Sequence, residues 1–463
     1  MSIASLPKRL ALGIGANAIG KVWIILIQIV SIPVLIVHWG AGGYGTWLML
    51  SAVPTYIALS DLGFSTAAGF AMTSRAAREE YDGARSSFQS VWVLLLLASA
   101  TLIAVGLAGS VIWIMTPYFE QRNTEVVIAA CLLCLYALIL LQTNLLYMAY
   151  KAANRYIEGT LLLDLLVPLE GGAVLSLAWV GAHYGACAAA LVVVRSCGLA
   201  MYYTRLRRYA PWLKYGFAEA SSGEIRALVK PAIAALSLPL STALNIQGII
   251  FAIGFALSPA AVAVFGPIRT ISRVPLQVVS LLSRTTLPEI TIAFSQTNHA
   301  RLARLIAVNC LALIAVAVPS ATVIALWGQA ALDILSRGHV SAPPGLFDIM
   351  AIVVLFQMIW NTAATFLLAL NMQHRFAHIF AGLSLASFGT AFAVAPKFGL
   401  NGVAGILLVV DVTMSIVIIR EWLKVTGMNG ASVLSNTVDL VPWLFQMSLD
   451  RLERWRASGS LWK

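Results

Sequence analysis

Charged residues are scarce in this chain. Only 11% of its 463 residues are Asp, Glu, Lys or Arg, whereas 60% are hydrophobic. Ordinary globular domains carry about 25% charged residues, so the composition excludes a typical soluble domain. Acidic residues are the scarcer kind, with 19 against 30 basic residues, and the formal net charge is +11.

Cysteine and histidine are also few, with five and six residues. All five cysteines lie in apolar stretches, and the CxxC pair Cys131 and Cys134 has no second pair and no neighbouring histidine. Packing therefore explains them better than zinc or redox chemistry. The sequence also offers no nucleophile with a neighbouring base and no phosphate-binding loop. We expect no enzyme activity, no catalytic residue, no metal and no cofactor.

Long apolar runs are what the chain has in plenty. A bilayer core about 30 Å thick needs roughly 20 apolar residues per helical crossing, and clusters of charge separate such runs here. The sequence therefore predicts an all-α integral membrane protein with about twelve transmembrane helices, near residues 12–37, 44–72, 88–115, 126–149, 157–181, 185–204, 231–257, 261–283, 305–327, 347–371, 376–395 and 400–420.

The basic residues are distributed unevenly between alternate loops. Of the 30 Lys and Arg residues, 23 lie on one side of the predicted membrane, three on the other and four inside spans. The positive-inside bias then predicts that both termini are cytoplasmic. The first apolar run is too long for a signal peptide, so we interpret it as an uncleaved span. Since topology explains the excess of basic residues, no nucleic-acid partner is indicated.

Several landmarks recur in the two halves of the chain. Tyr44-Gly45 aligns with Phe265-Gly266, and Arg155-Tyr156 aligns with Arg375-Phe376. Because each half holds six spans, an even number, both halves enter the membrane in the same orientation. Two parallel six-helix lobes with a pathway between them are typical of transporters.

This repeat and the composition of the connecting segments predict four regions. They are an N-terminal lobe over 1–204, a basic cytoplasmic linker over 205–230, a C-terminal lobe over 231–421 and a cytoplasmic tail over 422–463. The tail interleaves Trp and Leu with Arg, which is typical of a helix lying on the membrane surface.

The segment HWGAGGYGTWLMLSAVPTYIALSDLGFSTAAG, residues 38–69, resembles the second-span signature of polysaccharide transporters. These form the O-antigen (Wzx-type) and exopolysaccharide flippase branch of the MATE-like MOP superfamily. Leu287-Pro288 and the glycines Gly399 and Gly402 also fit. The resemblance implies a multi-pass protein of the bacterial inner membrane that moves undecaprenyl-pyrophosphate-linked oligosaccharide from the cytoplasmic to the periplasmic leaflet.

The same resemblance implies the partners and the driving force. The partners would be membrane lipids, the polyprenyl-pyrophosphate-linked glycan and polysaccharide polymerase or export proteins. Transport would proceed by alternating access, and a proton, sodium or the membrane potential are the candidate driving forces. The acids inside the spans that could couple an ion are Asp164, Glu170 and Asp411.

Arg269 and Arg273 stand four residues apart in the predicted eighth span. An arginine at mid-membrane costs about 2.5 to 3.5 kcal/mol on insertion scales, and residues at this spacing share one helix face. The pair is therefore expected to face protein or water. Either the arginines pair with acids, namely Asp61, Asp164, Glu170 or Asp411, or they offer paired donors to the pyrophosphate in a central cavity.

Other polar residues inside spans leave two readings open. Lys21 either extends to the cytoplasmic interface or joins the cavity as a third cation, and Arg195 is either a structural pair or a substrate contact. The amides either bind sugar hydroxyls or hold helices together; they are Asn17, Gln28, Asn245 and Gln247. For Asp61, close to a loop, we predict a capping or loop-pairing role.

Three other functions stay open at this stage. A MATE-type drug or organic-cation antiporter of the same superfamily would need acids in its cavity, where this sequence places arginines. A lipid II flippase would be expected to have two additional spans. An assembly protein without transport activity would not need an intact cavity.

Overall fold

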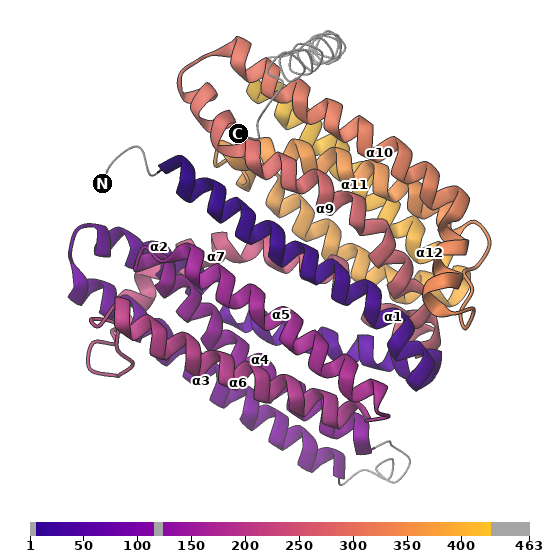
Figure 1. Cartoon of the computed structure of the whole chain (residues 1–463), viewed down its shortest axis with the longest axis horizontal. Coiled ribbons are helices and arrows are strands. Elements are labelled where there is room, and N and C mark those ends of the chain that lie inside the picture. Colours follow the sequence, from indigo (N-terminus) through magenta and orange to yellow (C-terminus); the bar gives the residue numbers. More distant parts are fainter. Residues whose placement is uncertain (1–5, 115–123, 427–463) are drawn as a thin grey trace, which may run out of the picture. The chain divides into compact units, whose positions relative to one another are not determined.

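The structure, a computed structural model, describes residues 6–114 and 124–426. The predicted surface helix of the tail lies beyond Thr426 and so outside the described residues. All regular secondary structure in the described ranges is helical, as the sequence predicted (Figure 1). The helices of the first half are α1 Leu6–Ala58, α2 Phe64–Ala77, α3 Tyr81–Ile114, α4 Thr124–Ala152, α5 Tyr156–Trp179 and α6 Tyr184–Tyr209. Those of the second half are α7 Ser222–Ala243, α8 Ile249–Ala256, α9 Pro259–Ser295, α10 His299–Ser336, α11 Leu346–Ala369 and α12 His374–Thr426.

Nine helical stretches in the described residues are long and apolar enough to cross a membrane, judged by length and composition. One of them, α12, has 53 residues. A straight helix of that length would measure about 80 Å, far more than the roughly 30 Å of a bilayer core. Its backbone leaves helical geometry at Gly399, and that of α1 does so at Gly40. These two glycines therefore divide long helical stretches into shorter ones.

The backbone at the two glycines explains why no other residue stands there. Gly40 has φ 69° and ψ 172°, and Gly399 has φ 60° and ψ −150°. Only glycine adopts this region at low cost. A Cβ added at either position would meet nothing within 4 Å, so the conformation alone, and not crowding, requires glycine.

The predicted second span, 44–72, is broken where the sequence predicted one continuous helix. Helix α1 ends at Ala58, a 3-10 turn follows over Leu59–Asp61, and α2 begins at Phe64. Asp61 Oδ1 accepts the backbone N–H of Ser65 at 2.8 Å, which confirms its predicted capping role. Gly63 has φ 81°, and a Cβ there would lie 2.3 Å from a backbone oxygen of α7, so the tight turn also lets α7 approach.

The described helices group into two compact units. The first contains the chain up to Thr270, with Gln329–Pro343 and Phe380–Val403. The second contains Ile271–Gly328, Pro344–Ile379 and the chain from Ala404 onward. Within the first unit α4 packs on α6, and α5 packs on both α1 and α6. The lobe boundaries predicted from the sequence, at residues 205–230, stay a prediction.

Within the first unit, large side chains fill the space between α3, α4 and α6. Phe88, Tyr150 and Tyr202 are fully buried. The Tyr150 hydroxyl donates to the Tyr202 carbonyl oxygen at 3.0 Å, and the Tyr202 hydroxyl donates to that of Gly159. Satisfying both hydroxyls removes the cost of burying them.

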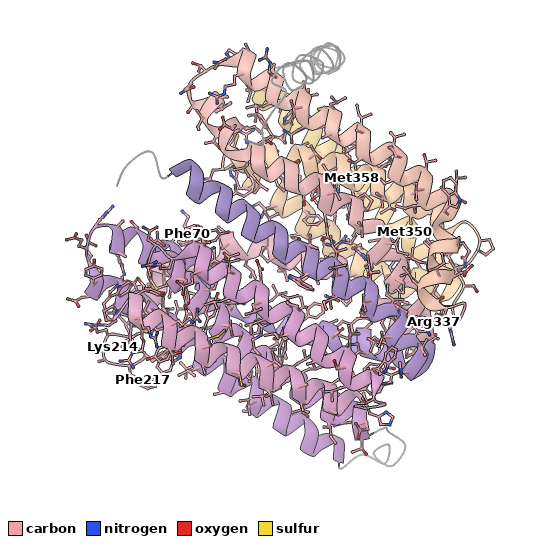
Figure 2. All side chains as sticks on the ribbon, viewed as in Figure 1. Phe70, Lys214, Phe217, Arg337, Met350 and Met358 are labelled. Carbon is pink, nitrogen blue, oxygen red and sulfur yellow. The ribbon has the colours of Figure 1, made fainter. Side chains whose placement is uncertain are left out.

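Outer helix faces carry exposed apolar side chains, while other apolar residues turn inward. Phe70 of α2 is 73% exposed, and Phe217, in the connection between α6 and α7, is 67% exposed, whereas Met350 and Met358 of α11 are buried (Figure 2). Exposed large apolar residues are unfavourable in water and favourable against lipid.

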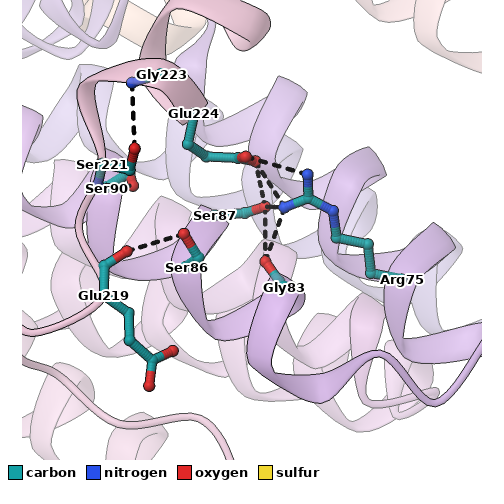
Figure 3. Close-up of polar contacts among 9 residues, drawn as sticks. All are labelled: Arg75, Gly83, Ser86, Ser87, Ser90, Glu219, Ser221, Gly223 and Glu224. Atoms are coloured by element: carbon teal, nitrogen blue, oxygen red, sulfur yellow. Dashed lines mark hydrogen bonds and ion pairs between the residues drawn. The ribbon is translucent and has the colours of Figure 1, made fainter.

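An ion pair joins α2 to the start of α7. Arg75 donates to both carboxylate oxygens of Glu224, at 2.7 and 3.0 Å, and to Ser87 Oγ at 2.6 Å (Figure 3). Ser87 Oγ in turn donates to Glu224 Oε1 at 2.7 Å, and Arg75 also donates to the Gly83 carbonyl oxygen. Bidentate pairs of this kind are among the stronger polar contacts.

The segment before α7 is held to α3 by hydrogen bonds. Ser86 Oγ donates to the Glu219 carbonyl oxygen, and the Ser221 N–H donates to Ser90 Oγ (Figure 3). Ser221 also caps α7, since its hydroxyl accepts the N–H of Gly223. Although its composition is that of a linker, this segment packs as part of the first unit.

Candidate functional site

Arg269 lies on α9 and contacts a second residue that the sequence singled out. Its side chain is only 6% exposed, and Nη2 donates to Asn245 Oδ1 at 2.7 Å. Asn245, itself buried, belongs to a five-residue π-helix, η4 Leu244–Gly248, between α7 and α8. Such bulges often mark functional sites, because they shift side chains out of α-helical register. The predicted seventh span thus presents an amide to the predicted arginine.

Arg273 lies one helical turn further along α9. It is half-buried, and its side chain makes no hydrogen bond or ion pair with any residue that the structure describes. Like charges at this spacing repel, so Arg269 does not stabilise it. A guanidinium removed from water and lacking a partner is costly.

Arg195 is paired with an acid. Its Nε and Nη2 donate to the two carboxylate oxygens of Glu170, both at 2.6 Å, across α6 and α5. Tyr136 of α4 completes the cluster, because its hydroxyl donates to Glu170 and accepts from Arg195, both at 3.0 Å. The arginine is 4% exposed and the glutamate 7%. Of the two readings for Arg195, the geometry favours the structural pair.

The remaining acids inside spans have different surroundings. Asp411 on α12 is 3% exposed and accepts the indole N–H of Trp360 at 2.7 Å. Asp164 on α5 lies against Gly20 of α1, where an added Cβ would come within 2.3 Å of its carboxyl carbon. The lack of a side chain at Gly20 therefore makes room for this acid.

The structure describes the side chains of only two of the four other predicted residues. Asn17 and Lys21 lie on α1, but their side chains are outside the described set. Gln28 is exposed, and Gln247 lines a cavity on the other side of the π-helix from Asn245.

That cavity belongs to the first unit and has a volume of about 580 Å³. It is bounded by the end of α1, the 3-10 turn η2 (Leu59–Asp61), the start of α2, and by α4, α7 and η4. The polar residues of its wall are Thr55, Asp61, Thr66, Asn144, Thr242 and Gln247. Sequence reasoning missed Asn144. It is one of two carboxamides in the run LLQTNLLYM, and the other is Gln142.

Within the described residues, no cluster of three or more His, Cys, Asp or Glu side chains could hold a metal ion.

Sequence reasoning also missed Tyr136 and Trp360. Both are aromatic residues in apolar runs, and their role shows only when the neighbouring helix brings an acid to them.

No protein-family model matches the chain, and no curated protein sequence matches it either. Solved structures do match. An inward-facing multidrug resistance MATE transporter of the MOP superfamily superposes with a TM-score of 0.69 over 87% of this chain and 94% of that one, at 11% sequence identity. The fold is that of the MATE transporters.

Two further structures with the MATE fold agree. A mutant MATE transporter of Vibrio cholerae gives a TM-score of 0.59 at 16% identity and covers 93% of this chain and 99% of its own. A MOP superfamily transporter from Pyrococcus furiosus, for which a binding pocket of reverse polarity is described, gives 0.56 at 13% identity over 88% and 95%. Together with the nine apolar helical stretches, the MATE fold confirms the predicted multi-pass membrane protein. The polysaccharide-flippase branch stays a prediction.

Proposed function

We propose that this protein is a flippase that moves polyprenyl-pyrophosphate-linked oligosaccharide across the bacterial inner membrane by alternating access. The MATE fold supports transport as the general activity. The second-span signature at residues 38–69 supports the polysaccharide branch. The nine apolar stretches of the described residues become eleven when Gly40 and Gly399 each divide one, and α9 would supply the twelfth span. With an even number of spans, the positive-inside bias then gives cytoplasmic termini.

Arg273 is the observation that carries the proposal. It is a permanent cation on the 37-residue helix α9, half-buried, with no hydrogen-bonding or ionic partner among the described side chains. Arg269, one turn away, donates to the neutral amide of Asn245. A pyrophosphate offers several anionic oxygens, which the planar donors of arginine bind in pairs. The cargo thus supplies the partner that Arg273 lacks.

Export of organic cations is the competing function, since transporters with this fold include multidrug exporters. A cation site needs accessible acids. Glu170 is bound on both oxygens by Arg195, and Asp411 accepts from Trp360 in a buried position. Asp61, on the wall of the cavity beside η4, accepts a backbone N–H with one oxygen. Because two of these three acids are occupied and buried, an anionic cargo is the better fit.

The driving force follows from the charge of the cargo. Outward movement of negative charge gains about 2.3 kcal/mol per charge for each 100 mV of inside-negative potential, so no cofactor is needed. Of the three acids predicted to couple an ion, Asp164 keeps that role in this proposal. A polymerase or export protein would then take the glycan from the periplasmic leaflet.

Replacing Arg273 with Gln tests the function. Losing a charge-assisted hydrogen bond of about 1.5 to 3 kcal/mol predicts a roughly 10- to 150-fold slower flipping of polyprenyl-pyrophosphate-linked sugar in proteoliposomes. Arg269→Gln should also slow flipping. Arg273→Lys should keep only part of the wild-type rate, because lysine keeps the charge but lacks the planar paired donors of arginine.

Arg337→Gln is the matched control, since Arg337 is exposed in the connection after α10. It should flip lipid at the wild-type rate. Wild-type rates in Arg273→Gln, with normal insertion into the membrane, would refute the anion site.

A further inference from the structure

We infer that the cavity between α1, α2, α4 and α7 binds a sugar residue of the cargo. This inference rests on the proposed function and assigns the glycan its own site in the first unit, separate from the arginines. Hydrogen-bond accounting, the size of the cavity and its position beside Asn245 carry the argument.

Four side chains of the cavity wall have unused hydrogen-bonding groups. Thr55, Thr66, Asn144 and Gln247 make no side-chain hydrogen bond with any residue in ranges 6–114 and 124–426. They come from four elements, namely α1, α2, α4 and η4. Each is partly exposed, so their donors and acceptors are open to the cavity and offer hydrogen bonds to a polar ligand there.

The threonines are informative because other helical threonines behave differently. Thr242, on the same wall, donates to the Leu238 carbonyl oxygen at 2.9 Å. Thr73 on α2 donates to that of Gly69 at 2.7 Å. This bond within the helix is the ordinary solution for a threonine in an apolar setting. Thr55 and Thr66 do not make it, so their hydroxyls stay available to the cavity.

The size and chemistry of the cavity favour a sugar over an ion or a phosphate. A bound cation needs oxygens at about 2.3 to 2.6 Å, whereas the cavity has a volume of about 580 Å³. Small-molecule pockets span roughly 300 to 1,000 Å³. No basic residue lies among its lining residues, which excludes a phosphate subsite. Carboxamides and hydroxyls both donate and accept, as sugar hydroxyls do.

The π-helix connects this cavity to Arg269. Asn245 and Gln247 are two residues apart in η4, and residues at that spacing point in different directions. Asn245 accepts from Arg269, while Gln247 lines the cavity. A pyrophosphate held near Arg269 would therefore have its first sugar on the Gln247 side, which is how the two groups are joined in the cargo.

Two lipid probes test the subsite in purified, reconstituted protein. One is polyprenyl pyrophosphate without sugar, and the other is the same lipid carrying one N-acetylhexosamine. Replacing Asn144 or Gln247 with Leu should weaken binding of the glycosylated lipid by about 2- to 13-fold per lost neutral hydrogen bond. Binding of the bare lipid should not change.

Thr73→Val is the matched control, since this hydroxyl is bonded within its helix and Thr73 is not among the residues that line the cavity; binding of both lipids should stay at the wild-type level. The isosteric change Thr66→Val tests the site with the least risk to folding and should weaken only the glycosylated lipid. Equal weakening of both lipids, or of neither, would overturn the sugar site, as would displacement of the glycosylated lipid by a cationic dye in a manner that depends on Asp61. If the wild-type protein binds neither lipid, the proposed function itself fails.

Discussion

At the scale of single residues, Glu170 and Arg195 show how a buried charge is stabilised by its partner. Each is buried inside a span, and together with Tyr136 they satisfy most of each other's polar atoms. Removing one partner of a buried pair leaves an uncompensated charge, whereas replacing both with apolar residues of similar size is often tolerated. The pair therefore offers a way to separate a structural role from a substrate role.

Glu170→Leu or Arg195→Leu alone should destabilise the protein by about 3 to 5 kcal/mol. The double variant Glu170→Leu with Arg195→Leu should recover most of that loss, because no buried charge remains. Thermal unfolding in detergent measures the stability, and lipid flipping measures the function. A double variant that is stable yet unable to flip lipid would show that Arg195 binds cargo after all.

At this scale the sequence predicted positions better than partners. It identified Arg195 and Glu170 as costly residues inside spans, but for Arg269 it offered four acids or the pyrophosphate as partners and not Asn245. Which acid meets which base depends on the rotation of α5 and α6 about their axes, and apolar runs without clear periodicity do not specify that rotation. Asn144 was missed for the same reason, since the sequence of an apolar run does not show which face of the helix an amide lies on.

At the scale of elements, Gly40 provides a test that isolates backbone conformation. A Cβ at Gly40 would touch nothing within 4 Å, and the same is true of Gly42, whose φ is not positive. Gly40→Ala should thus cost about 1 to 3 kcal/mol through strain alone. Gly42→Ala should be neutral or slightly stabilising, because alanine narrows the unfolded ensemble.

Unfolding midpoints of the two alanine variants, measured side by side in detergent, decide this point. Equal midpoints for Gly40→Ala and Gly42→Ala would mean that the left-handed backbone at Gly40 is not needed.

Helix existence followed from apolar runs, but helix breaks did not. The predicted second span reads as one run, yet it is interrupted at Leu59–Asp61, where the chain needs a cap from Asp61 and a close approach at Gly63. The sequence of the π-helix at Leu244–Gly248, LNIQG, does not differ in pattern from that of an ordinary helix. Such breaks are set by tertiary contacts, here with α7 and α9, which a local pattern does not contain.

At the scale of the whole molecule, orientation in the membrane is the prediction on which the direction of transport depends. The distribution of basic residues places the α2–α3 connection in the cytoplasm and the α10–α11 connection in the periplasm. Glu80 and Ser341 are exposed in these two connections. They are suitable reporter positions, because substitution there disturbs no side-chain hydrogen bond of the described residues.

In a variant whose five native cysteines are replaced, Ser341→Cys should react with a membrane-impermeant thiol reagent in intact cells. Glu80→Cys should react only after the inner membrane is permeabilised. The reverse pattern would turn both termini to the periplasm, and the inside-negative potential would then oppose export of an anionic lipid rather than drive it. Because the arginines on α9 act in either orientation, this labelling decides the direction of the cycle independently of the cargo.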